Sequence, residues 1–132
     1  KCMRILMLCL SFFLVFNTAY AGDEESAEPV IEYIEMAPKF TVNLDRANKY
    51  LVVNVQLMVE GEKFIEKVRK HLPALRHELI MLYSGRPSTE LQTMEQREAL
   101  RVETKKAITK VLEKHSNSDG FRDVFFTEFL VN

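Results

Sequence analysis

The last strand-like segment of this chain, residues 121–131, is the feature that most constrains its fold. Taken alternately, its residues place apolar side chains on both faces: Val124, Phe126 and Leu130 on one, and Phe125, Thr127, Phe129 and Val131 on the other. Strands that are apolar on both sides are typical of the middle of a sheet or of a strand covered on both faces. The sequence therefore predicts a central or fully covered strand here.

A second segment, residues 50–60, alternates with period two. One face is entirely aliphatic and is predicted to join the core, whereas the other is mixed and is predicted to be half exposed; the aliphatic residues are Leu51, Val53, Val55, Leu57 and Val59. Residues 40–44 form a shorter strand of the same kind, and a polar connection of hairpin length joins the two. These two strands are expected to pair antiparallel. A weaker strand signal covers residues 31–36, before Pro38.

Between these strands the apolar residues follow helical spacing. The sequence predicts a helix from Glu62, a new helix or a kink at Pro73, a short turn at 88–92, and a long helix that starts with a Thr93–Gln96 capping box and runs to about Lys114. The predicted buried stripes are Phe64, Ile65, Val68 and Leu72; then Leu75, Leu79, Ile80 and Leu82; then Leu100, Ala107, Ile108, Val111 and Leu112. The order of elements predicts an α+β domain: a small antiparallel-rich sheet of three to four strands, with helices packed on one face.

The N-terminal residues 1–21 are predicted to be a signal peptide. Lys1 and Arg4 precede an apolar run at 5–16, and an A-x-A pattern ends at Ala21, where cleavage is expected. The alternative is a short uncleaved membrane segment, because the run extended to Ala21 reaches the lower limit for a span. The acidic stretch 22–29 is predicted to be a flexible linker, followed by a periplasmic domain at 30–132. Both cysteines precede the expected cleavage point, so the mature chain has neither disulfide nor thiol nucleophile.

The remaining composition argues against several kinds of chemistry. The 18 basic and 19 acidic residues nearly balance, which gives no electrostatic reason to expect a nucleic-acid partner. No phosphate-binding, metalloprotease or serine-hydrolase motif occurs. His71 and His77 do not have the spacing of a helical metal pair, so surface histidines are favoured over a metal site. Neither a cofactor nor a catalytic residue is expected. A basic stripe that includes Arg97 and Lys105 is more typical of a solvent-exposed helix face than of a surface that binds anionic lipid or an acidic partner.

An ordered set of short motifs resembles the periplasmic domain of the flagellar basal-body-associated FliL family. The motifs are PKFTVNL at 38–44, YLVVNVQL at 50–57, LPALR at 72–76, LQT at 91–93 with Glu95, Leu100 with Arg101, and VFFTEFLV at 124–131. The resemblance implies a non-enzymatic motility protein of stomatin-like fold, located in the periplasm beside the inner membrane. It also implies assembly into rings and contact with flagellar stator and basal-body proteins, in support of stator engagement and flagellar rotation.

Motif position and polarity suggest five candidate protein-contact residues: Arg76, Glu95, Arg101, Thr127 and Glu128. The alternative is that the two arginines make ion pairs within the domain and that Thr127 and Glu128 are ordinary strand residues. Two other functions stay open. One is a stomatin-like envelope scaffold unrelated to motility. The other is a small secreted hydrolase or ligand carrier, which would need a deep pocket with convergent polar groups. Membrane anchoring applies only if the N-terminal segment is not cleaved.

Overall fold

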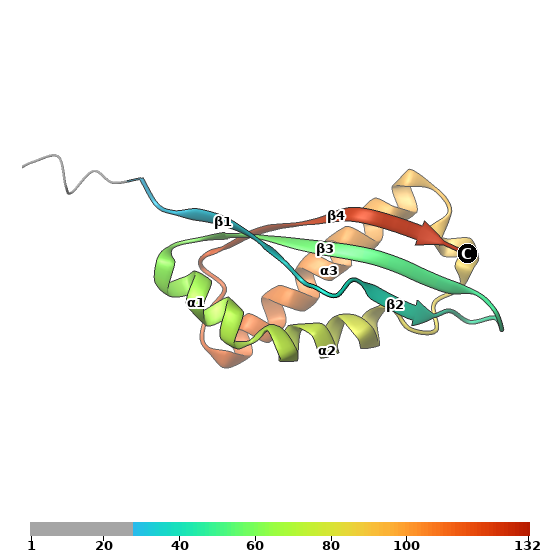
Figure 1. Cartoon of the computed structure of the whole chain (residues 1–132), viewed down its shortest axis with the longest axis horizontal. Coiled ribbons are helices and arrows are strands. Elements are labelled where there is room, and N and C mark those ends of the chain that lie inside the picture. Colours follow the sequence, from blue (N-terminus) through green and yellow to red (C-terminus); the bar gives the residue numbers. More distant parts are fainter. Residues whose placement is uncertain (1–27) are drawn as a thin grey trace, which may run out of the picture.

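A single long strand, β3 (Tyr50–Glu60), organises the sheet of this protein. The computed structural model describes residues 28–132, so the expected signal segment and most of the acidic linker lie outside it. The strand β4 (Phe121–Val131) pairs antiparallel with β3 along one edge. Two shorter strands, β1 (Ile31–Glu35) and β2 (Phe40–Asn43), pair antiparallel with the two halves of β3 along its other edge (Figure 1). The α+β class and the four-stranded antiparallel sheet are as predicted.

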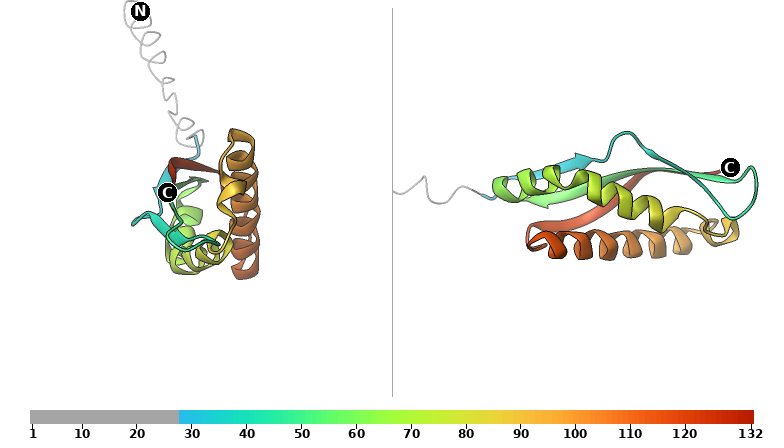
Figure 2. Two further views of the ribbon diagram at one scale, coloured as in Figure 1. Left: turned by 90° about the vertical axis from the view of Figure 1, so that its right-hand side faces the viewer. Right: turned by 90° about the horizontal axis from the view of Figure 1, so that it is seen from below.

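All the helices lie on one side of this sheet (Figure 2). They are α1 (Glu62–Lys70), α2 (Leu72–Tyr83) and α3 (Met94–His115), with a one-turn 3₁₀ helix, η1 (Ser88–Leu91), before α3. The long helix α3 begins with the predicted capping box, in which the Thr93 hydroxyl accepts from the Gln96 amide and the Gln96 side chain accepts from the Thr93 amide.

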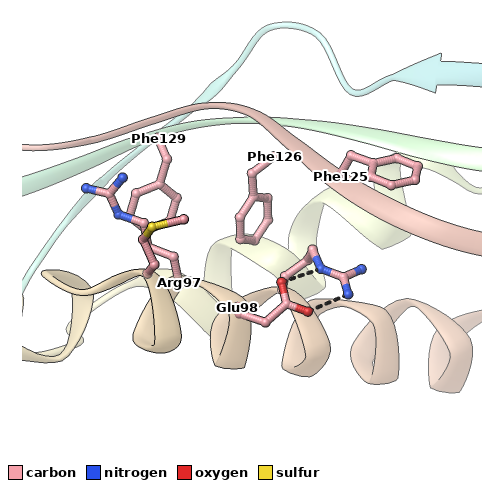
Figure 3. Close-up of a pocket in the computed structure, with 7 residues that line it drawn as sticks. Arg97, Glu98, Phe125, Phe126 and Phe129 are labelled. Atoms are coloured by element: carbon pink, nitrogen blue, oxygen red, sulfur yellow. Dashed lines mark hydrogen bonds and ion pairs between the residues drawn. The ribbon is translucent and has the colours of Figure 1, made fainter.

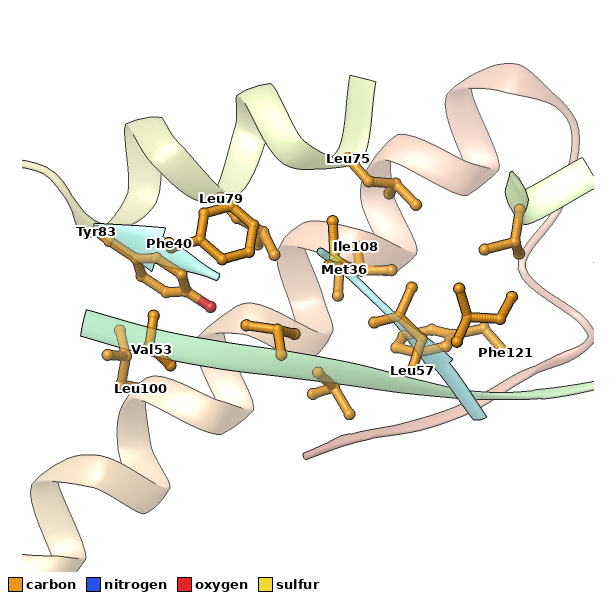
Figure 4. Close-up of a cluster of buried hydrophobic side chains, with 14 of the residues drawn as sticks. Met36, Phe40, Val53, Leu57, Leu75, Leu79, Tyr83, Leu100, Ile108 and Phe121 are labelled. Atoms are coloured by element: carbon orange, nitrogen blue, oxygen red, sulfur yellow. The ribbon is translucent and has the colours of Figure 1, made fainter. Parts of the chain in front are cut away.

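The core lies between the sheet and the helices (Figure 4). The five aliphatic residues predicted for the inner face of β3 are all fully buried, while the alternate residues are half-buried. Phe40 and Val42 of β2 join them, as do Ile34 and Met36 at the end of β1. The sheet therefore has one face covered by helices and one without a helix over it, as antiparallel sheets commonly have.

The predictions for β4 were wrong in two respects. Within the described chain β4 pairs only with β3, so it is an edge strand and not a central one. The register shifts between Asn54 and Val55, which pair with Glu128 and Phe126, so Thr127 is an extra residue in a β-bulge. A bulge reverses the alternation of side chains, and Phe129 and Val131 therefore share the helix-facing side with Phe126.

The helical stripes were predicted well except in α2. There the buried residues are Leu75, Leu79 and Tyr83, whereas Ile80 is 37 % exposed and Leu82 is only half-buried. The spacing of four between the buried residues selects one narrow face, and the bulky Tyr83 takes the place that Leu82 was expected to hold. In α3 Thr104 is also fully buried, although its polar side chain was not part of the predicted stripe. None of the helices in the described range is long and apolar enough to cross a membrane.

Candidate functional site

A groove of about 450 Å³ lies between the first turns of α3 and the strand β4 (Figure 3). Its lining is mostly aromatic on the strand side and charged on the helix side: Phe125, Phe126 and Phe129 from β4, and Met94, Arg97, Glu98 and Arg101 from α3. The elements that form it are positioned by the capping box, which fixes the start of α3, and by the bulge at Thr127, which aims Phe129 toward the helix.

The aromatic wall is continuous with the core. The ring of Phe126 lies 5.6 Å from that of Phe129 and 6.4 Å from that of the buried Tyr83. At the solvent side, the Arg97 guanidinium lies 4.9 Å from the centre of the Phe129 ring, a cation–π contact. Met94 is 83 % exposed beside it. Met94 and the three phenylalanine rings line the same groove, and a contiguous apolar patch of this kind is suited to a partner.

The charged wall is an ion-pair network centred on Arg101. Its guanidinium makes a two-pronged contact with Glu98, at 2.9 and 2.6 Å, and a further one with Asp123 at 2.7 Å. The hydrogen bond from Arg101 lowers the pKa of Glu98, and the contact with Glu98 in turn raises the pKa of Arg101. Burial acts to raise the pKa of Asp123, but the Val124 amide and Arg101 outweigh it and hold that pKa below its usual value. Arg101 is therefore a fixed part of the domain.

The five predicted contact residues differ in their location and in the bonds that they make within the domain. Arg101 lies in the groove but is held by ion pairs within the domain, as the alternative interpretation had it. Glu95 is exposed in the first turn of α3 and Thr127 is the exposed bulge residue. Glu128 forms an ion pair with Lys39 at 2.9 Å.

Arg76 lies apart from the groove. It donates to the Pro38 carbonyl at 2.6 Å and lies 4.4 Å from the centre of the Phe40 ring. Within the described chain Arg76 therefore bonds to a carbonyl and an aromatic ring, instead of the ion pair that was considered.

The groove residues other than Arg101 were not predicted as contacts. The sequence does contain an indication of the groove, because three of the five residues 125–129 are phenylalanine, more than a single buried face of a strand would hold. The bulge hid it, because strict alternation assigns Phe126 and Phe129 to opposite faces.

The uncovered face of the sheet is a second apolar surface. Ile31, Tyr33 and Leu130 are about half exposed there, and the Tyr33 ring lies 6.3 Å from that of Phe125. In the described residues no three side chains of histidine, cysteine, aspartate or glutamate are placed to hold a metal ion.

The sequence of this chain is similar to a known protein family and to named members of it. The family model for the flagellar basal body-associated protein FliL matches residues 33–131. The chain is 33 % identical over 99 residues to the flagellar protein FliL of Aquifex aeolicus (strain VF5), an alignment covering 74 % of this chain and 59 % of that relative. It is 28 % identical over 92 residues to the flagellar protein FliL of Escherichia coli (strain K12), covering 70 % and 60 %. The chain thus spans about three fifths of the length of these relatives.

Proposed function

Because this chain belongs to the FliL family of flagellar basal body-associated proteins, a non-enzymatic family, we propose that it supports stator engagement and flagellar rotation by protein–protein contact. In this proposal it is exported, with residues 1–21 as a signal peptide or short membrane segment and residues 22–29 as a linker. Residues 30–132 form a periplasmic domain beside the inner membrane, which assembles with further copies into a ring near the stators.

The observation that carries this proposal is the groove between α3 and β4. Aromatic residues, methionine and arginine are enriched at the centres of protein interfaces, and here Phe126, Phe129, Met94 and Arg97 form one continuous surface. Arginine and large aromatic residues are enriched in interface hot spots, and in this groove an arginine lies beside phenylalanine rings. The family match supports this proposal, because the family is named for its association with the flagellar basal body.

The experiment that tests the function is motor speed measured against load in a strain lacking this gene. We expect torque to fall at high load while flagella still assemble, and to return on complementation with the intact gene. Normal torque at all loads would contradict the stator role and favour an envelope scaffold unrelated to motility.

Complementation with point variants separates contact from folding. Glu95 and Thr127 are the predicted contact residues that form no side-chain bond within the described chain, so Glu95→Ala and Thr127→Ala should leave the fold intact. If either residue touches a partner, its variant restores less torque than the control Lys106→Ala, an exposed position about three turns further along α3. Arg76→Ala and Arg101→Ala are unsuitable for this purpose, because both residues bond to their own domain.

A further inference from the structure

The free edge of β4, on both sides of the bulge at Thr127, is the strongest unexplained feature of the groove between α3 and β4. We propose that this edge, from Phe126 to Val131, pairs with an extended segment of a partner protein that carries a carboxylate for Arg97. The proposal deepens the function above, on which it rests for the existence of a partner. It is carried by three observations: the direction of the backbone groups on β4, the closure of one end of the edge, and the charge that remains in the groove.

The hydrogen bonds of the β3–β4 ladder determine which backbone groups of β4 face outward. Tyr50 and Asn132 exchange two bonds, the Tyr50 amide donating at 3.2 Å and the Asn132 amide at 3.0 Å. In an antiparallel ladder such pairs alternate with pairs whose amides and carbonyls point away from each other. Along the register, the amides and carbonyls of Val131 and Phe129 therefore point to the free edge.

The bulge at Thr127 moves this alternation by one residue. Before it, the outward-pointing residues are Phe126 and Val124. The contacts of Val124 agree with this phase, since its carbonyl accepts from Arg101 at 3.1 Å and its amide donates to the Asp123 carboxylate at 2.8 Å.

One end of the edge is therefore closed, and the other is open. Arg101 and Asp123 occupy both outward groups of Val124, which blocks strand addition at that end, a common way of protecting a sheet edge. In the described chain no side chain bonds the outward backbone groups of Phe126, Phe129 or Val131. Strand addition is thus possible only beside the aromatic part of the groove.

The chemistry of the groove specifies the incoming segment. A strand added at this edge places alternate side chains toward Phe126 and Phe129. Those side chains must be apolar, because the surface that they cover is aromatic. Arg97 makes no ion pair within the described residues, in contrast to Arg101. A carboxylate on the incoming segment would pair with Arg97 over the ring of Phe129.

A second copy of this chain fits the edge less well. Two β4 strands paired antiparallel across it would be related by a two-fold axis near Phe129. Since Arg97 lies over the Phe129 ring, the axis would bring the Arg97 side chains of the two copies toward each other. Like charges at an interface disfavour the pairing, so the observations favour a partner of different sequence.

The test uses the purified protein and overlapping synthetic peptides that cover the periplasmic segments of the stator and basal-body proteins of the same organism. We expect one or more peptides with apolar residues and an acidic residue to bind. Binding should slow amide hydrogen exchange at Phe126, Phe129 and Val131 and leave Val124 unchanged. Arg97→Glu should weaken that binding at least tenfold, whereas Arg97→Lys should weaken it less. The matched control is Lys106→Glu, the same charge reversal elsewhere on α3.

Val131→Pro provides an independent measurement. Its amide is not used in the ladder, so proline removes the outward donor without breaking a ladder hydrogen bond, and Val131→Ala controls for the lost side chain. Peptide binding unaffected by both Arg97→Glu and Val131→Pro, or no binding by any peptide, would overturn the proposal. A concentration-dependent dimer of the intact protein that Val131→Pro abolishes would overturn it in favour of a second copy. Normal torque in the deletion strain, together with peptide binding at the edge, would contradict the stator role and leave the edge-pairing proposal standing.

Discussion

The phenol oxygen of Tyr83 lies 2.8 Å from the hydroxyl oxygen of Thr104, and both residues are fully buried. The Thr104 hydroxyl also lies 2.8 Å from the Leu100 carbonyl, which can only accept. Thr104 therefore donates to Leu100 and accepts from Tyr83, so this pair joins α2 to α3 inside the core. Burial raises the pKa of Tyr83 far above its ordinary value, which keeps the phenol neutral and able to donate.

The effects of removing the two hydroxyls of this pair should not be additive. In Thr104→Val the buried Tyr83 hydroxyl has no acceptor, and we expect the free energy of unfolding to fall by about 1–3 kcal/mol. The double variant Tyr83→Phe/Thr104→Val should lose less than the sum of the two single variants, because no unpaired hydroxyl remains. Urea unfolding followed by circular dichroism measures all four proteins. Strictly additive losses would mean that the two hydroxyls do not interact.

Gly120 should not tolerate a side chain. A Cβ there would lie 2.4 Å from Phe64 Cδ1 and 2.5 Å from the Glu60 carbonyl oxygen. The carbonyl is backbone, and the Glu60 amide also donates to the Gly120 carbonyl at 2.8 Å, so neither strand can move without breaking the pair. We expect Gly120→Ala to lower the free energy of unfolding by about 3 kcal/mol.

Gly85→Ala is the matched control. Gly85 has a positive φ of 77°, but a Cβ there meets nothing within 4 Å. Its loss should be limited to the cost of the left-handed backbone, about 1–2 kcal/mol. Thermal unfolding of the two variants compares them directly, and equal losses would show that the close approach at Gly120 is easily relieved.

The capping box should set the order of the first turn of α3. Thr93→Ala removes the acceptor for the Gln96 amide, 3.1 Å away, and we expect a loss of about 1 kcal/mol. Thr93 is exposed, so core packing is not altered. Thr93→Ser should preserve the cap. Because Met94 and Arg97 lie in the turns that this cap orders, hydrogen exchange should quicken there in Thr93→Ala and stay unchanged in α2.

Acid should weaken the contact between α1 and the end of α3. The His71 and His115 rings are stacked, with centres 4.3 Å apart. Partial burial, followed by the charges of His115 and of Lys70 and Lys67, lowers the pKa of His71 from its ordinary value. The unfolded chain therefore binds more protons than the folded chain as the pH falls. The stability contributed by neutral His71 is complete above the ordinary pKa of about 6.5 and is lost as the pH falls through the lowered folded value.

The variant His71→Gln isolates this effect. Its free energy of unfolding should change less than that of the intact protein between about pH 7.5 and about pH 5, because the titrating group is absent. Denaturant midpoints at a series of pH values provide the comparison. Parallel pH curves for the two proteins would assign the acid sensitivity to other groups.

Local patterns predicted most of the fold because they are strong in this chain. The inner face of β3 is aliphatic at every alternate residue, and the Thr93–Gln96 capping box marks the start of α3 with hydrogen bonds between neighbours in the sequence. Such signals need no knowledge of distant residues, and the structure bears them out.

The errors concern properties that only tertiary contacts decide. An apolar edge strand and an apolar central strand have the same composition, so β4 could not be distinguished from a central strand by its residues alone. The bulge at Thr127 depends on the register with Asn54, far away in the sequence. In the same way, nothing local to Arg101 indicated that Asp123 of another element would pair with it.

Each of the other three described strands pairs with β3, so the sheet cannot be complete until segments far apart in the sequence have met. The strands β1 and β2 are close to β3 in the sequence and can join it early, but the partner for its second edge is β4, which comes only after all the helices. Contacts between such distant segments close late and slow the search for the native state. The folding rate should therefore depend on when β4 pairs, and a chain in which β4 has not yet paired keeps one side of β3 open.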